Sequence, residues 1–407
     1  MHQSTNSADE TFVFTDGRPT TIYLPGSITE TITYDRAGRQ TGIKAVKGTT
    51  TLTNYTGSYV NASGNDTALL QTESDNIAGT SSTYSYDGLN RLTGAAGTGT
   101  GSNSFTYAYD SNGNRTQTSK NGTYSAIYGF NAANELVTSG GATSGSYDQN
   151  ANQLSTGTGL ALGYNTKNQT TSFTPPSSVT INAGYLDTDQ NGRTSFGTTS
   201  QQNGLLGLYS DTTGSTASYY THLATGTAQT LSEVVGNSAY YYLTDLRGSV
   251  VAATDVNGNV QATYKYDPYG TSLGTTGNIS NPIRFDGGYY DSSTALYKFG
   301  ERYYNSTDAR WTQLDPSGQN PGYNFSGDDP VNQVDPTGTT TLSYEQQGQI
   351  VGGALGCGGG AFLFSETGPV GLYVGCSLGV FPGAHVGGSI GKAVDAFFNI
   401  RTFFRKF

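Results

Sequence analysis

Four aspartates of this sequence are followed by proline, and paired carboxyl groups of this kind could carry acid–base chemistry. Two of the four stand in the segments Leu314-Asp315-Pro316 and Asp335-Pro336-Thr337-Gly338. Two carboxyl groups held close together do not both ionise easily, so they share a proton and divide into a base and an acid. Aspartate before proline also suits a plainer role, because its side chain bonds the backbone of a turn. Spacing alone favours the turn interpretation.

Other catalytic residue types are sparse. Cys357 and Cys376 are the only cysteines, so the sequence has no disulfide framework and no repeated metal-ligand spacing. The three histidines, His2, His222 and His385, are too few and too scattered for a histidine-based site. We therefore expect no metal and no cofactor, and carboxylate chemistry if any.

Composition indicates the kind of fold that must position these residues. At about 150 residues per domain, 407 residues give two to three domains. Charged residues are 12% and the net charge is −10, so the basic surface that nucleic acids require is missing. The 30 tyrosines are large apolar bodies with a hydroxyl, and we expect them to build the core. The 57 glycines favour many short strands and tight turns, hence an all-β protein.

A repeat runs through the first half of the chain. Each copy has an aromatic residue, Asp or Asn, a turn, and then Arg, Asn or Gln; copies start at Tyr34, Tyr86, Tyr109, Phe130, Tyr147 and Tyr164. In one copy, residues 104–109 alternate as a half-buried strand does, and residues 110–114 supply the Asp, Asn and Gly of a hairpin turn. A lone hairpin is marginal in water, so the units must stack on one another. A disordered linker would not keep its aromatic anchors in register with turn residues.

Residues 240–338 differ in kind and hold an ordered series of motifs. The motifs are Asp255-Val256-Asn257-Gly258-Asn259, Asp267-Pro268-Tyr269-Gly270, Arg284-Phe285-Asp286-Gly287, Glu301-Arg302-Tyr303-Tyr304, residues 310–316 and residues 335–338. The repeats followed by this series resemble the Rhs/YD-repeat family and its C-terminal repeat-associated core. The family includes polymorphic toxins, the C components of insecticidal toxin complexes and the YD shells of teneurins.

The resemblance implies antiparallel hairpin repeats wound as a β-spiral, a shell that encloses a variable C-terminal polypeptide. This chain is short, so its repeats make only part of a shell. We assign residues 1–236 to the YD-type repeats, 237–338 to the repeat-associated core and 339–407 to a glycine-rich tail that is the candidate effector.

The resemblance also assigns roles to the acidic residues. The family's core resembles an intramolecular aspartyl protease that cuts just after the Asp-Pro-x-Gly motif, here between Gly338 and Thr339. By motif, the site residues are Arg302, Asp315 and Asp335, with Arg302 orienting a carboxylate through a bidentate contact. Thr339 stands where relatives usually place a bulky apolar residue. Autoprotease and structural turn both stay open.

The tail changes composition abruptly. Glycines recur every four residues at 348, 352, 356 and 360, and again from 371 to 391. This spacing puts small residues on one helix face, where two helices approach closely. Between Gln349 and Ile390 the only charged residue is Glu366, and residues 397–407 form a basic aromatic end. We expect two glycine-faced helices that contact membranes through 349–407; a passive segment packed in the shell and an enzymatic toxin are the alternatives.

Two function classes follow. The first is a shell or delivery protein for its own tail, a polymorphic toxin of interbacterial competition with an immunity protein as partner. The second is a structural or adhesive YD-repeat protein that binds carbohydrate or partner surfaces without catalysis. We expect a secreted or cell-surface location, although the polar residues after Met1 do not form a signal peptide. No nucleic-acid partner is expected.

Overall fold

The computed structural model describes residues 10–15, 18–186, 192–204, 207–223, 229–318 and 322–343. The predicted glycine-faced helices and their membrane contact lie outside these ranges. Within them, the helical elements are two short 3-10 turns, η1 (Phe285–Gly287) and η2 (Phe325–Asp328), and all other regular elements are strands. No helix in the described part of the chain is long and apolar enough to cross a membrane. The all-β prediction is confirmed.

Two large antiparallel sheets form a wall in which every strand pairs with its sequence neighbours. The first sheet comprises β1 (Thr11–Thr15), β2 (Arg18–Leu24), β3 (Ile28–Tyr34), β4 (Gln40–Lys47), β5 (Thr50–Ser58), β6 (Thr72–Asp75), β7 (Thr80–Tyr86), β8 (Leu92–Thr98), β9 (Phe105–Tyr109), β10 (Arg115–Lys120), β11 (Thr123–Phe130), β12 (Leu136–Ser139) and β13 (Ala142–Thr143). The second comprises β14 (Ala161–Tyr164), β15 (Thr170–Thr174), β16 (Ile181–Tyr185), β17 (Arg193–Phe196), β18 (Thr199–Gly204), β19 (Gly207–Thr213), β20 (Thr216–His222), β21 (Thr230–Val235), β22 (Ser238–Thr244), β23 (Val250–Thr254), β24 (Val260–Tyr266) and β25 (Ser272–Thr276).

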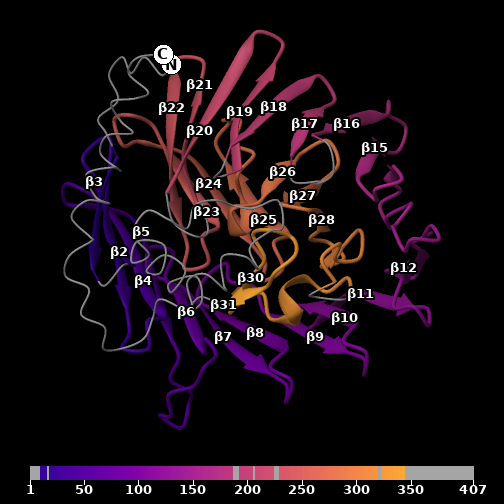
Figure 1. The fold of residues 1–407 in the computed structure, drawn as a ribbon. Coiled ribbons are helices and arrows are strands. Elements are labelled where there is room, and N and C mark those ends of the chain that lie inside the picture. Colours follow the sequence, from indigo (N-terminus) through magenta and orange to yellow (C-terminus); the bar gives the residue numbers. More distant parts are fainter. Residues whose placement is uncertain are drawn as a thin grey trace, which may run out of the picture.

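The wall winds back on itself (Figure 1). Buried Ile22, Ile28 and Ile43 from the first sheet share one apolar cluster with Leu243 and Ala252 from the second. The ammonium of Lys47 also donates a hydrogen bond to the side chain of Asn259, 212 residues away. The start of the spiral is therefore covered by its end, and the apolar strand faces meet in the interior.

The repeats and the core form several sheets and not a single continuous one. The ladder is broken between β13 and β14, where the described pairings are the isolated bridges Tyr147↔Gln153 and Ser155↔Ala161. The repeats that start at Phe130, Tyr147 and Tyr164 are 17 residues apart, against 23 and 21 for the two preceding intervals. The shorter repeats leave too little chain for full strands.

The repeated turn has one geometry, seen clearly at Asp87. Its Oδ1 accepts the backbone N–H groups of Leu89 and Arg91 at 2.9 and 3.0 Å. Its own N–H donates to the Arg91 carbonyl, and the fourth residue, Asn90, has a φ of 64°. Asn and Gly tolerate that left-handed conformation, which explains their place in the repeat. The same side-chain bond to the fifth residue's N–H recurs at Asp110, Asn131, Asp148, Asn165, Asp245, Asp255 and Asp267.

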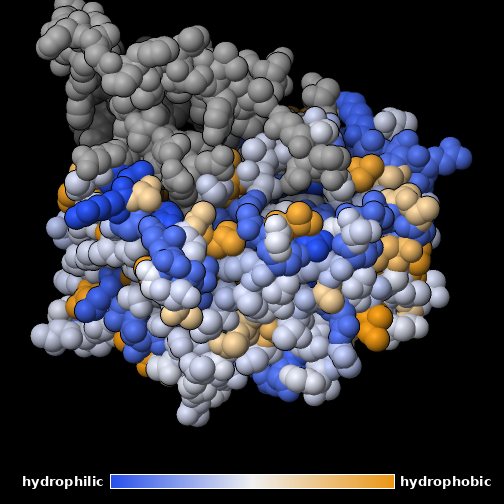
Figure 2. All heavy atoms as spheres, turned by 90° about the horizontal axis from the view of Figure 1, so that it is seen from below, coloured by the Kyte–Doolittle hydropathy of each residue, from blue (hydrophilic) through white to orange (hydrophobic). Residues whose placement is uncertain are grey.

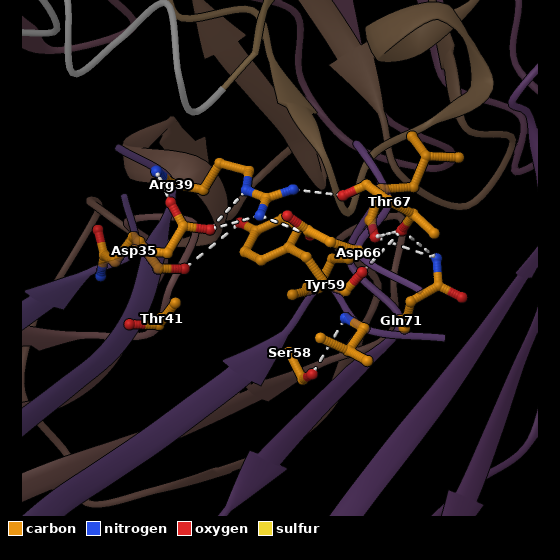
Figure 3. Close-up of polar contacts among 12 residues, drawn as sticks. Asp35, Arg39, Thr41, Ser58, Tyr59, Asp66, Thr67 and Gln71 are labelled. Carbon is orange, nitrogen blue, oxygen red and sulfur yellow. Dashed lines mark hydrogen bonds and ion pairs between the residues drawn. The ribbon is translucent and has the colours of Figure 1, made fainter. Parts of the chain in front are cut away.

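Arginine at the fifth position joins one turn to the next aromatic anchor (Figure 3). Arg39 donates to Asp35 at 2.6 Å and to Asp66 at 2.8 Å, and it also bonds the Thr67 carbonyl. Its guanidinium lies 4.2 Å from the ring centroid of Tyr59, a cation–π distance. Each such arginine thus stabilises two neighbouring parts of the spiral at once.

The core segment lies inside the wall (Figure 1). It contains a four-stranded sheet of β26 (Tyr289–Asp291), β27 (Leu296–Phe299), β28 (Arg302–Asn305) and β29 (Arg310–Trp311), and a pair of β30 (Gln333–Val334) and β31 (Leu342–Ser343). All residues of β27, β28 and β29 are buried. The rings of Tyr297, Phe299, Tyr304 and Trp311 pack together with Phe285 and Phe325. The outer face in Figure 2 is mostly hydrophilic or neutral, which fits strands whose apolar sides point inward.

Candidate active site

The three predicted site residues come from three consecutive pieces of the core. Arg302 opens β28, Asp315 follows β29, and Asp335 follows β30. Arg302 and Asp335 are fully buried, and Asp315 is 7% exposed. Burial of three ionisable groups in one segment is expensive unless they pair with one another.

Arg302 divides its hydrogen-bond donors between two partners. Its Nη2 lies 3.0 Å from Oδ2 of Asp335, and its Nε donates to the carbonyl oxygen of Gly338. The predicted bidentate contact with a carboxylate is therefore not what the structure contains. Trp311 covers the guanidinium, with 4.1 Å between Cζ and the ring centroid. The remaining nitrogen, Nη1, is buried and finds no hydrogen-bond partner among the described residues.

Asp335 forms the same turn as the repeats of the wall. Its Oδ1 accepts the N–H groups of Thr339 and Thr340, each at 3.0 Å. Gly338, the fourth residue of the turn, has a φ of 66°. Burial raises the pKa of the Asp335 carboxyl, and the Arg302 charge with the two backbone N–H groups offsets only part of that shift. The carboxyl is thus both a turn residue and a group that holds a proton more readily than usual.

Asp315 is linked to the same segment through Ser317. Its Oδ1 accepts the backbone N–H of Ser317 at 2.8 Å and the hydroxyl at 2.7 Å. That hydroxyl oxygen lies 3.5 Å from the carbonyl oxygen of Thr339. Burial lowers the pKa of Arg302, while the charges of Asp335 and Asp315 act in the opposite direction. Both carboxylates therefore act on one guanidinium.

Together these contacts surround a single peptide bond. The carbonyl oxygen of Gly338 is held by Arg302, and the nitrogen of Thr339 is 3.0 Å from Asp335. This is the bond between Gly338 and Thr339 at which the sequence predicts cleavage. Sequence reasoning missed Trp311 and Ser317, because nothing in their local pattern shows that they touch Arg302 or Asp315.

Comparison with known proteins agrees with a YD-repeat shell. A family model described as the teneurin YD-shell matches residues 61–331, about two thirds of the chain. The chain belongs to the teneurin YD-shell family, as the resemblance to Rhs/YD-repeat proteins predicted.

Solved structures share the fold. The crystal structure of TcdB2-TccC3 superposes with a TM-score of 0.65 at 17% identity, covering 83% of this chain and 20% of that one. The structure of the Photorhabdus luminescens Tc holotoxin pore gives 0.64 at 17% identity over 85% of this chain and 20% of that one. This chain therefore spans about a fifth of those chains and shares their shell fold.

A curated relative is similar over a shorter stretch. Salivary gland surface protein 1 of Aedes aegypti is 37% identical over 99 residues, which are 22% of this chain and 3% of that protein. The match is too short to carry the whole relative's properties to this chain.

Proposed function

We propose that this chain is a shell segment whose core holds its own C-terminal polypeptide, residues 339–407, and frees it by cutting between Gly338 and Thr339. The observation that carries the proposal is the enclosure of that one peptide bond by Arg302 on its oxygen and Asp335 on its nitrogen. The fold shared with the Photorhabdus luminescens Tc holotoxin pore supports a toxin-related shell.

In this reaction Asp315 is the base. Its carboxylate takes a proton from a water molecule whose oxygen bonds to the carbonyl carbon of Gly338. The carbonyl oxygen becomes an oxyanion, which the buried Arg302 guanidinium stabilises through the bond that it already makes. The unpartnered Nη1 is a second donor available to this charge.

Asp335 is the acid. The tetrahedral intermediate collapses by breaking the bond between the Gly338 carbon and the Thr339 nitrogen, and Asp335 gives its proton to that nitrogen. The products are a carboxylic acid at Gly338 and an amine at Thr339, and transfer of the acid's proton to the amine gives a carboxylate and an ammonium group. The pair of aspartates keeps one proton, now on Asp315. The raised pKa of Asp335 suits this role, since a general acid must hold a proton at the working pH.

The freed tail is the effector in this proposal. Its glycine-faced pattern suits insertion into membranes, and an immunity protein would protect the producing cell in interbacterial competition. Secretion or display at the cell surface is the location that such a role needs.

A structural or adhesive YD-repeat protein, with carbohydrate or protein partners, is the second candidate function. Asp315 and Asp335 favour it in one respect, because their side chains bond turn backbone as the wall aspartates do. In that case the two carboxyl groups stabilise turns and the chain stays whole.

Replacement of each aspartate by asparagine separates the two functions. Asparagine preserves much of the turn but cannot shuttle the proton, so Asp315→Asn and Asp335→Asn should slow release of the tail by about 100- to 10,000-fold. Intact mass of the stored protein against time measures the rate. Asp255→Asn, in a wall turn of the same geometry, is the matched control and should cleave as the wild type does. If Asp335→Asn released the tail at the same rate as the wild type, the structural role in the turn would be the only one left for Asp335.

A further inference from the structure

The core contacts four successive turns of the wall in the same way. In each turn, the carbonyl of the fourth residue accepts a hydrogen bond from a core side chain. The pairs are Asn324 with Gly113 at 2.6 Å, Arg310 with Asn134 at 2.5 Å, Tyr323 with Ala151 at 2.7 Å, and Gln313 with Asn168 at 3.1 Å.

The turn geometry explains why this carbonyl is the one used. The first and fifth carbonyls of each turn accept the turn's own N–H groups, as Asp110 and Asn114 do. The fourth residue has a positive φ, 87° at Gly113 and 60° at Asn168, and its carbonyl is left out of that local pattern. Backbone carbonyls covered by other chain segments need donors. The core supplies one donor for each of the four turns.

Gln313 is held more tightly than a single contact requires. Its amide nitrogen donates to the Asn168 carbonyl, and its amide oxygen accepts the hydroxyl of Thr170 at 3.3 Å. The two bonds run in opposite senses, so they fix one orientation of the amide. Gln313 is 3% exposed and Thr170 is fully buried.

Thr312, the residue before Gln313, is also held by hydrogen bonds. The N–H of Thr312 donates to the carbonyl of Tyr303, which follows Arg302, and the N–H of Gln153 in the wall donates to the carbonyl of Thr312; both distances are 2.9 Å. Residues 312–313 are thereby placed against the strand that carries Arg302 and against the wall. Asp315 comes two residues later.

We infer that Gln313 is a positioning residue that ties Asp315 to the turn at residues 165–169, so that cleavage depends on a correctly wound wall. The inference rests on the proposed self-cleavage and adds its regulation. A chain whose repeats are misregistered cannot seat Gln313, and Asp315 is then displaced from the Gly338–Thr339 bond. Release of the tail before the shell is complete is prevented in this way.

The test compares variants that remove one rim contact each. Gln313→Ala should slow release of the tail by about 10- to 100-fold, because a catalytic group misplaced by about 1 Å loses that much rate. Tyr323→Phe removes the matching hydrogen bond to Ala151, on a different wall turn from the one that Gln313 contacts, and it should leave the rate within about twofold of the wild type. Both are followed by intact mass at one pH, with thermal unfolding measured on the same samples.

A second pair of variants, at Thr170, separates an effect on positioning from an effect on stability. Thr170→Val keeps the shape of the side chain but removes the hydroxyl that Gln313 accepts, whereas Thr170→Ser keeps the hydroxyl and loses a buried methyl group. Positioning predicts that the serine variant keeps its rate while the valine variant slows, whichever is the less stable. Rates that follow stability across the four variants would overturn the inference, as would a wild-type rate in Gln313→Ala. A wild type that never cleaves overturns the proposed function itself, and the positioning role with it.

Discussion

The wall and the core use the same aspartate turn with opposite consequences for the carboxyl group. Asp110 in the wall and Asp335 in the core each accept the N–H of the residue four positions later. Burial opposes ionisation at Asp110, but bonds from Asn114 and Asn112, with the Arg310 charge, still lower its pKa. At Asp335 burial outweighs Arg302 and the turn N–H groups, and the pKa is raised. Local turn chemistry is alike, so burial decides which aspartate can hold a proton.

Burial also raises the pKa of carboxyl groups outside these turns. Burial raises the pKa of Glu233 to about 7 and that of Glu30 to about 8, both on inward faces of wall strands. Asp328 and Asp329 in the core also have a pKa of about 7, again chiefly through burial. In the wall turns at Asp87, Asp110 and Asp255 the pKa is lowered. The carboxyl groups of Glu30, Glu233, Asp328 and Asp329 are buried and hold a proton more readily than usual.

The largest expected effect is the loss of the buried arginine. Arg302→Ala leaves the Asp335 carboxyl buried without its partner, which should destabilise the protein by about 3–5 kcal/mol. Arg91→Ala removes a partly exposed arginine that pairs with Asp87 and stacks on Tyr109, and should destabilise it by about 1 kcal/mol. Urea unfolding of both variants measures the difference. Equal losses would mean that the core pair is no more important than a wall pair.

Two glycines at the fourth turn position give the next effect. Both have a φ near 66°, where alanine is strained by roughly 1–2 kcal/mol. A Cβ on Gly318 meets nothing within 4 Å, whereas a Cβ on Gly338 would lie 2.4 Å from the Phe299 carbonyl and 2.9 Å from the Arg302 nitrogen. Gly338→Ala should therefore add about 1–3 kcal/mol of overpacking to the strain and slow release of the tail. Gly318→Ala should show the strain alone in urea unfolding.

The third expected effect is a pH dependence of stability. Burial raises the pKa of Glu233 to about 7, above its ordinary value of 4.5, so its contribution to stability is complete below about pH 4.5 and is lost as pH rises through 7. Stability should fall between pH 5 and 8, by up to about 1.4 kcal/mol per pH unit for each such group. Glu233→Gln should make the fall less steep by the share of this one group, as measured by urea midpoints.

Asp110→Asn is the control for that measurement. Because the pKa of Asp110 is lowered, its contribution is present at neutral pH and is lost only as the solution becomes strongly acidic. The slope from pH 5 to 8 should therefore match that of the wild type. A stability curve that rises over this range would contradict the picture of a proton-holding interior.

The turns of the wall could be predicted because their chemistry is local. Asp at the first position and Gly or Asn at the fourth follow from one side-chain bond and one positive φ, all within five residues. The all-β class follows from the same repeats. The break in strand pairing near residues 144–160 also has a sequence signal. The repeats there are only 17 residues apart, which leaves room for short strands only.

For the candidate site, the sequence predicts which residues take part but not the contacts between them. Motifs place Arg302 and Asp335 in the sequence, but 33 residues separate them, and the contact of Arg302 with the Gly338 carbonyl depends on how β28 lies beside the last turn. The bond between Gln313 and Asn168 spans 145 residues and needs the whole wall. Such contacts depend on how the whole chain winds, so no local sequence pattern predicts them.

The most direct measurement is the mass and terminal sequence of the wild-type protein after incubation at mildly acidic and neutral pH. Self-cleavage predicts two fragments, one ending at Gly338 and one beginning at Thr339, that appear at a rate independent of protein concentration. A chain that stays whole, or one that is cut at another bond, would contradict an acid–base role for Asp315 and Asp335 and leave them as turn residues.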